Sequence, residues 1–298
     1  MIFRFTLLFC LLTIWSTLQA QTLRVAATVK PLHSLVAGVM QGAGQPELVL
    51  TGSESPHHYS LRPSERRTLA DATLVFWIGP QFEAFLTGLM EDRAGQRHIA
   101  LIDTAGIETL PARTTHDTGE SAAHPDPHIW LSVKNARIMV DEIARQLVEL
   151  DPGQRSVYLR NRDAMHARLD ALDQQLHMQL DDLHSPFLTF HDAYQYFERD
   201  YRLHSAGFVS NSEELRPGAQ HVRALIENIE RKNIGCLLYD APSQPALVKT
   251  LQRGHNLKAV ELDPLGLRLH PGAGLWFSLM RNIASGFEGC LRNRNDNS

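Results

Sequence analysis

Four short segments of the chain carry side chains of the types that bind divalent metal ions in proteins. Each contains one histidine or aspartate of interest, namely His57, His128, His191 and Asp263. Imidazole nitrogens and a carboxylate oxygen are donors that Zn²⁺ accepts in a tetrahedral site. Any one of these residues taken alone is more often a loop residue that is paired with its neighbours. The positions of the four residues along the chain strengthen the interpretation that together they form a metal site.

The elements that must position these residues alternate in type. Short apolar, β-branched runs predict strands at 23–29, 47–51, 73–78 and 98–102, and again at 187–190, 205–209, 234–239 and 259–262. Helical stretches separate them at 32–40, 63–70 and 81–90, and then at 193–201, 218–232 and 244–255. This rhythm predicts an α/β fold with two lobes, each a mostly parallel four-stranded sheet flanked by helices.

The candidate residues lie next to the ends of these elements. His57 follows the second predicted strand, His191 ends the first strand of the second lobe, and Asp263 ends the last strand. His128 stands just before a predicted helix that starts at Val133. Open α/β sheets bind their ligands beyond the C-terminal ends of the strands. Because each lobe contributes two of the groups, we predict a metal cleft between the lobes.

A long helical region connects the two predicted lobes. Residues 133–150 form one amphipathic helix, which Asp151-Pro152 interrupts, and residues 153–183 continue without Pro or Gly after the first residue. This second part would reach about 45 Å and act as one rigid connection. The predicted division is a first lobe at 21–152, a linking helix at 153–183 and a second lobe at 184–298. One apolar stripe at 3–4 spacing follows the linking helix: Met165, Leu169, Leu172, Leu176, Leu180 and Leu183.

Residues 1–20 have the features of an export signal peptide. Arg4 precedes an apolar run at 5–15, and Ala20 offers a small residue for cleavage. The run is too short to span a bilayer, and no later window is long and apolar enough, so we expect no direct membrane insertion. The 298 residues carry a net charge of -4 and no long basic run, which argues against nucleic acid as a partner.

Cleavage after about Ala20 would remove Cys10 and leave Cys236 and Cys290. In an oxidising compartment such a pair is naturally interpreted as a disulfide. The spacing alone leaves a pair of buried free thiols open. A metal site built on cysteine is disfavoured, because the chain has no CxxC.

Taken together, the motifs resemble those of the periplasmic zinc-binding proteins of zinc ABC importers, within the family of metal-binding solute-binding proteins. The resemblance rests on segments 56–64, 126–132, 190–194 and 262–266, and it continues through 30–32 and 217–220 over the mature chain. It implies two α/β lobes bridged by a long rigid helix, a monomer in the periplasm, and a disulfide between the two cysteines. It also implies a non-enzymatic protein that binds Zn²⁺ as its transported ligand and has a membrane permease subunit as its partner.

The same resemblance assigns the metal ligands residue by residue. His57 is preferred to His58 because it stands two residues before the Tyr of the motif. Some zinc members have a Glu directly before the first His, where this chain has Pro56. The fourth ligand is therefore either Asp263 or a water. The three imidazole ligands implied are His57, His128 and His191.

Alternatives remain for the metal, the activity and the surrounding residues. Manganese members tend to replace one His by an acid, so the retained His191 favours zinc, with Mn²⁺ or another divalent metal as the first alternative. A secreted zinc hydrolase would also use three ligands and a water, but no HExxH helix or Gly-x-Ser-x-Gly elbow occurs. Residues 112–126, with His116 and His124, form either a solvated loop or a weak auxiliary metal site. Asp192 and Tyr194 either orient groups near the site or begin a helix.

Overall fold

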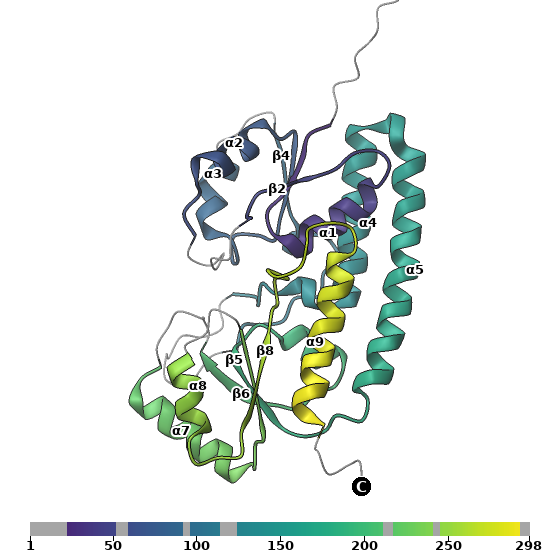
Figure 1. The fold of residues 1–298 in the computed structure, drawn as a ribbon. Coiled ribbons are helices and arrows are strands. Elements are labelled where there is room, and N and C mark those ends of the chain that lie inside the picture. Colours follow the sequence, from purple (N-terminus) through teal and green to yellow (C-terminus); the bar gives the residue numbers. More distant parts are fainter. Residues whose placement is uncertain are drawn as a thin grey trace, which may run out of the picture.

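Two parallel β-sheets form the centres of two lobes, which lie one above the other beside a layer of long helices (Figure 1). The computed structural model describes residues 23–51, 59–91, 96–113, 124–210, 217–240 and 245–292. The first lobe contains β1 (Val25–Ala27), α1 (Lys30–Met40), β2 (Glu47–Leu48), α2 (Pro63–Asp71), β3 (Leu74–Trp77), α3 (Thr87–Glu91) and β4 (Arg97–Ala100). The second contains β5 (Phe187–His191), α6 (Gln195–Asp200), β6 (Ser205–Ser210), α7 (Ala219–Arg231), β7 (Cys236–Asp240), α8 (Pro245–Gln252) and β8 (Lys258–Leu262).

The two sheets share one topology, in which all the strands are parallel. Their strand orders are β2-β1-β3-β4 and β6-β5-β7-β8. In each lobe the chain leaves the first strand toward one edge of the sheet and then crosses to its other side. At such a reversal the C-terminal ends of the two central strands border a crevice where open α/β sheets bind ligands. The prediction of two similar parallel lobes is confirmed.

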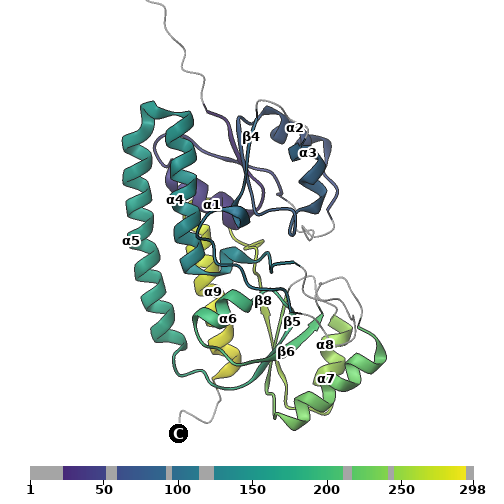
Figure 2. The same ribbon diagram turned by 180° about the vertical axis from the view of Figure 1, so that it is seen from behind.

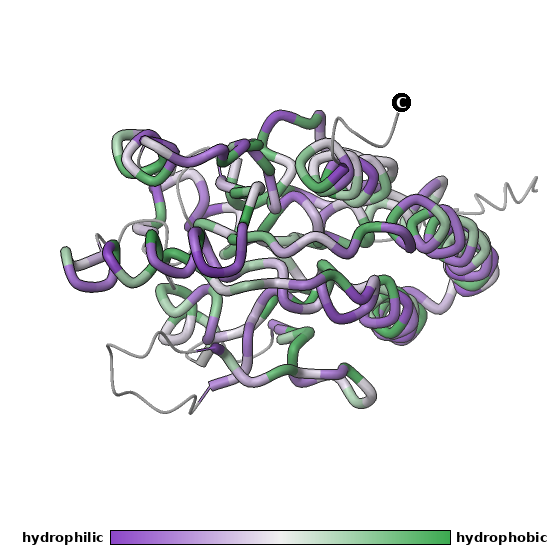
Figure 3. The backbone as a smooth tube through the Cα atoms, turned by 90° about the horizontal axis from the view of Figure 1, so that it is seen from below, coloured by the Kyte–Doolittle hydropathy of each residue, from purple (hydrophilic) through white to green (hydrophobic). Residues whose placement is uncertain are grey.

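The layer of helices consists of α1, α4 (Val133–Leu150), α5 (Arg155–Leu180) and α9 (Leu275–Leu291). The 26 residues of α5 span about 39 Å, and this helix runs beside both lobes (Figures 1 and 2). Its predicted stripe is buried, with every member from Met165 to Leu183 at most 4% exposed. Hydrophilic and hydrophobic residues are mixed along the helices of the molecule (Figure 3). None of the helices in the described ranges is apolar over a length that would cross a membrane.

One hydrophobic core is common to both lobes and to the helices between them. It includes Phe76 of β3, Ile143 of α4, Leu172 of α5, Phe187 of β5 and Phe287 of α9. A second, smaller core lies on the other face of the second sheet, beneath α7 and α8. Because apolar contacts continue from one lobe into the other, the helices form a shared framework rather than a flexible linker.

Helix α9 has no counterpart among the helices predicted from the sequence. Its buried residues recur at 3–4 spacing, as in Trp276, Met280, Ile283 and Phe287, and pack against α1, α5 and the second sheet. This apolar stripe is present in the sequence but was not interpreted as a helix. At Gly286 the helix approaches β8 so closely that a Cβ would lie 2.2 Å from Leu262 Cδ2. A larger residue there would require the side chain of Leu262 to move.

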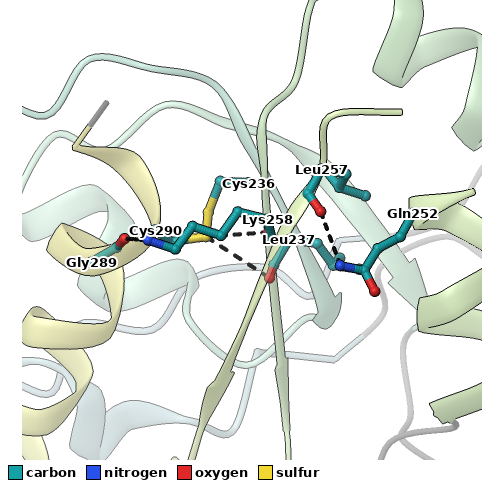
Figure 4. The surroundings of a disulfide bond; sticks show 7 residues. All are labelled: Cys236, Leu237, Gln252, Leu257, Lys258, Gly289 and Cys290. Carbon is teal, nitrogen blue, oxygen red and sulfur yellow. Dashed lines mark hydrogen bonds between the residues drawn. A yellow bond between two sulfur atoms is a disulfide. The ribbon is translucent and has the colours of Figure 1, made fainter. Parts of the chain in front are cut away.

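The predicted disulfide between Cys236 and Cys290 is present (Figure 4). It joins the first residue of β7 to the last turn of α9. Beside it the Lys258 ammonium donates a hydrogen bond to the carbonyl of Gly289 (Figure 4). The disulfide thus ties α9 to the second sheet.

The helix predicted at 81–90 begins later than expected. A 3₁₀ turn at Ala84–Leu86 leads into α3. The buried carboxylate of Glu83 accepts hydrogen bonds from the N–H groups of Ile78 at 2.8 Å and Gly79 at 3.2 Å. These bonds fold the residues before Ala84 into a loop at the end of β3.

Candidate metal centre

His191 is the last residue of β5, at the C-terminal edge of the second sheet. Side chains alternate along this strand, so that Leu188 and Phe190 enter the smaller core and Phe187 enters the shared core. His191 therefore projects on the same face as Phe187, toward the shared core. The same alternation along β7 brings its last residue, Asp240, to this face.

The carboxylate of Asp240 lies beside the imidazole of His191. Oδ2 of Asp240 is 3.3 Å from Nδ1 of His191, and the two side chains are 1% and 3% exposed. The hydroxyl of Tyr194 donates a hydrogen bond to Oδ1 of Asp240. A carboxylate at Nδ1 favours the neutral tautomer that carries its proton on that nitrogen, which leaves Nε2 with the lone pair that binds a metal.

His128 has a comparable carboxylate in a turn that leads into α4. Oδ1 of Asp126 accepts the backbone N–H of His128 at 3.0 Å and lies 2.7 Å from its Nδ1. The other carboxylate oxygen of Asp126 accepts a hydrogen bond from Nε2 of Gln195 at 3.2 Å. Asp126 is only 2% exposed, so little water competes for these bonds. The ring of His128 is thereby held with Nε2 directed away from the carboxylate.

The two imidazoles face each other across the junction between the lobes. Their ring centroids are 5.1 Å apart with planes inclined by 74°. Phe82 and Trp130 pack against His128 with centroid distances of 5.8 Å and 5.2 Å. His128 and His191 are 4% and 2% exposed. The structure thus brings two of the predicted ligands together in a largely water-excluded place.

Asp263 follows β8 on a loop that lies between neighbours of the two histidines. In the pairing of β7 with β8, Leu262 is opposite Asp240. On the other side, the indole N–H of Trp130 donates a hydrogen bond to the carbonyl of Pro264 at 2.8 Å. Oδ1 of Asp263 is buried and accepts no hydrogen bond from the described part of the chain. A buried carboxylate oxygen in this state is suited to receive a cation.

A cavity of ≈ 400 Å³ adjoins His128. Its wall includes His124, Asp126 and Asp192. His124 was predicted in a solvated loop or weak auxiliary site, and the structure places it on this wall, near the candidate centre. The main chain beside it is held by a hydrogen bond from the N–H of Ala112 to the carbonyl of His124 at 3.1 Å.

Arg113 and Asp192 form another part of this wall, and Glu198 pairs with the same Arg113. Nε of Arg113 donates to both carboxylate oxygens of Asp192, at 2.9 Å and 3.0 Å, and Nη1 donates to Glu198 at 2.8 Å. Burial raises the pKa of Glu198 to about 7, although the charge of Arg113 opposes this shift. Burial also raises the pKa of Asp192 against the hydrogen bonds from Arg113. The hydrogen bonds from Arg113 to Asp192 connect segment 108–113 with the end of β5, and Tyr194 donates to the carboxylate next to His191.

The segments 108–113 and 124–132, which carry Arg113 and His128, lie across α6 of the second lobe. Hydrogen bonds and an ion pair hold them there. Because the contacts of Asp126 and Ser132 are made by the turn that carries His128, they fix its position relative to the second lobe. They run from Leu110 N to Tyr196 Oη (3.1 Å), from Tyr196 Oη to Asp126 O (2.6 Å), from Ser132 Oγ to Asp200 Oδ2 (2.6 Å) and between Arg199 and Glu108 (3.2 Å).

Two of the predicted site residues, His57 and His116, lie outside the described residues. Within the described ranges, no three side chains of His, Cys, Asp or Glu come together closely enough to hold a metal ion. What these ranges contain is the facing pair His128 and His191, with Asp263 on an adjoining loop. The sequence-based interpretation had given no role to Asp240 or Arg113 and had not seen that Asp126 orients a ring.

Comparison with known proteins yields a consistent set of relatives. The model of a family described as "Zinc-uptake complex component A periplasmic" matches residues 25–290. The chain is 33% identical to the high-affinity zinc uptake system protein ZnuA of Brucella abortus (strain 2308), over 93% of this chain and 94% of that protein. It is 30% identical to ZnuA of Paracoccus denitrificans (strain Pd 1222), over 92% and 93%. A crystal structure of ZnuA, 25% identical, superposes with a TM-score of 0.78 and covers 91% of this chain and 100% of that one.

Proposed function

The chain belongs to the family of periplasmic zinc-uptake components, and on this basis we propose that it captures Zn²⁺ in the periplasm and delivers it to the membrane permease of an ABC importer. The observation that carries the proposal is the facing pair of buried imidazoles, His128 and His191. Each has a buried carboxylate at its Nδ1, so both rings are prepared to bind one cation through Nε2.

His57 and Asp263 complete the proposed ligand set. His57 follows β2 in the first lobe and joins the set by resemblance alone, since it lies outside the described residues. Three neutral imidazoles and one carboxylate form a tetrahedral site with donors about 2.0–2.2 Å from Zn²⁺. The buried oxygen of Asp263 would supply the one negative charge of this set. A water in its place would leave the ion with three protein ligands.

Binding would exchange the water shell of Zn²⁺ for side chains that are already oriented. Asp126 hydrogen-bonds the ring of His128, Oδ2 of Asp240 lies 3.3 Å from Nδ1 of His191, and the aromatic side chains of Phe82 and Trp130 limit the access of water to His128. Such preorganisation raises affinity because little side-chain freedom is lost on binding. It also slows release, so the permease must displace a ligand-bearing loop to take the ion.

The remaining parts of the proposal concern processing and organisation. Residues 1–20 are removed after about Ala20 on export to the periplasm, and the mature chain acts as a monomer. The first lobe at 21–152 and the second at 184–298 are connected through the helical region 153–183. The partner is the permease subunit, to which the loaded protein presents its ion.

The decisive experiment is metal content and zinc affinity of the purified mature chain, with each proposed ligand replaced by Ala in turn. One equivalent of zinc is expected in the wild type, with weaker binding in every variant. His166→Ala provides a matched control, because His166 lies on α5 and pairs with Asp141 instead. If all four variants keep the wild-type affinity, the proposal fails.

The same preparation tests the two competing activities. Competition of Mn²⁺ against Zn²⁺ at equal concentration would favour a manganese carrier if Mn²⁺ displaced zinc. Hydrolysis of esters or peptides by the zinc-loaded protein, lost in His191→Ala, would support a secreted hydrolase. Growth of a deletion strain under chelation, rescued by added zinc, connects binding with uptake.

A further inference from the structure

Lys30 is the first residue of α1, in the first lobe, and its ammonium reaches across to the second. Nζ donates hydrogen bonds to the carbonyl oxygens of Leu267 at 2.6 Å and Leu269 at 3.1 Å, and lies 3.5 Å from that of Gly266. A positive charge at the N-terminus of a helix is unfavourable for the helix itself. The side chain is therefore placed for its contact with the loop rather than for the stability of α1.

The loop to which Lys30 donates these hydrogen bonds begins with Asp263. It is closed by internal hydrogen bonds from Gly266 N to Asp263 O at 3.3 Å and from Arg268 N to Asp263 Oδ2 at 3.1 Å. Gly266 has a φ of 65°, which glycine adopts without strain. The loop has no strand or helix of its own, so its position depends on such contacts.

The second anchor of the loop also comes from the first half of the chain. The indole N–H of Trp130, two residues after His128, donates to the carbonyl of Pro264 at 2.8 Å. With Lys30 on one end and Trp130 on the other, the backbone around Asp263 is fixed to the part of the molecule that carries His128. This leaves the buried Oδ1 of Asp263 in a defined place, with Oδ2 occupied by the N–H of Arg268.

We propose that Lys30 is a positioning residue of the metal site, which holds the Asp263 loop across the junction between the lobes so that the Asp263 carboxylate can bind the ion. The inference rests on the proposed function and adds a residue that touches no metal. Its charge-assisted hydrogen bonds to backbone carbonyls are stronger than neutral ones and suit a fixed anchor. Loss of the anchor would let the carboxylate leave the ion, and would raise the rate of zinc release more than it slows capture.

The test is a double-mutant cycle on zinc affinity and zinc release with Lys30→Met and Asp263→Ala in the full mature chain. Lys30→Met is expected to weaken zinc binding about tenfold and to speed release to a chelator by a similar factor, as the loss of an outer partner of a ligand does. In the Asp263→Ala background the same change should have no further effect, because the residue it positions is already gone. A side chain that only supported the fold would weaken binding equally in both backgrounds.

A matched control exists in the second lobe. The Lys258 ammonium also donates to a backbone carbonyl, that of Gly289, beside the disulfide. Lys258→Met should leave zinc affinity unchanged. If Lys30→Met does not fold, Lys30→Gln takes its place in the cycle. Because its amide can still reach one carbonyl, a loss of less than tenfold is expected; no loss at all, or an equal loss in the Asp263→Ala background, overturns the role of Lys30.

The outcomes separate the two proposals. A wild-type chain that binds no zinc would overturn the proposed function. A wild-type chain that binds zinc, with Lys30→Met equal to it, or with Lys30→Met losing as much affinity in the Asp263→Ala background, would overturn the role of Lys30 alone.

Discussion

Replacing Asp126 tests whether the buried carboxylate beside His128 prepares that ring for zinc. Asp126 is 2% exposed, and it lies 2.7 Å from Nδ1 of His128. Outer partners of metal-binding histidines typically contribute 10–100-fold to metal affinity, or about 1.4–2.7 kcal/mol. Asp126→Asn keeps an oxygen that can accept from Nδ1 but loses the charge, so we expect a loss of about tenfold. Asp126→Ala also removes the acceptor, and the loss should approach about 100-fold.

The assay is competition for zinc between the metal-free protein and a chelator of known affinity at pH 7.5. Asp163→Asn is the matched control, because the Asp163 side chain on α5 is 66% exposed. Thermal unfolding of the metal-free variants separates a loss of fold from a loss of ring orientation, since Asp126→Ala also frees the backbone N–H of His128 and the amide of Gln195. Wild-type affinity in a folded Asp126→Ala variant would refute the argument that the carboxylate orients the ring.

Three further predictions concern protonation and the disulfide. Zinc affinity should fall below about pH 6.5, since imidazoles must be neutral to bind metal, and equal affinities in titrations at pH 5 and pH 7.5 would contradict this. Burial raises the pKa of Glu83 from 4.5 to about 7 despite hydrogen bonds to its carboxylate. Between these two pH values the folded chain keeps a proton that the unfolded chain has lost. The free energy of unfolding should therefore fall as the pH rises from about 4.5 to about 7. At about 1.4 kcal/mol per pKa unit, the free energy of unfolding should change by about 3 kcal/mol. Urea unfolding of Glu83→Gln between pH 5 and pH 8 should show a free energy of unfolding that depends less on pH than in the wild type. A pH dependence equal to that of the wild type would exclude Glu83 as the cause. Replacing both Cys236 and Cys290 by Ser should lower the free energy of unfolding by about 2–4 kcal/mol, and reductant should destabilise the wild type but not the variant.

Local pattern was sufficient to predict most of the fold. Helix α4 has the predicted bounds, because an amphipathic stripe runs from Val133 to an interrupting Asp-Pro pair. His191 ends β5 as predicted, because the apolar run of the strand stops there. Helix α9 was missed although Trp276, Met280, Ile283 and Phe287 recur at helical spacing, so the local signal for this helix was present in the sequence and was not used. The late start of the helix near Ala84 depends on Glu83 bonding back to the end of β3, a contact that propensity does not encode.

Some residues of the candidate site could be predicted from local sequence, and others only from contacts between distant parts of the chain. His128, His191 and Asp263 could be selected from their place at the ends of elements. The role of Asp126 had a local signal, since an acid two residues before a His in a turn can reach the ring. Asp240 lies 49 residues beyond His191 in number but beside it in space, because β5 and β7 are neighbours in the sheet order. That adjacency belongs to the topology, and no spacing in the sequence reveals it.

The same dependence on long-range contacts explains why the site requires the whole fold. Lys30 and Trp130 reach the Asp263 loop from the first half of the chain, and Arg113 reaches Asp192 next to His191. Each contact crosses from one lobe to the other, so the donors come together only when both lobes pack on the helices. A cation held by donors from both lobes therefore binds the packed state and not the unfolded chain, and it stabilises that packing by about 2.7 kcal/mol when free zinc is 100 times its dissociation constant. On the proposed ligand set, ion binding and lobe packing stabilise each other, so a permease that loosened the packing at the site would lower the affinity for the ion.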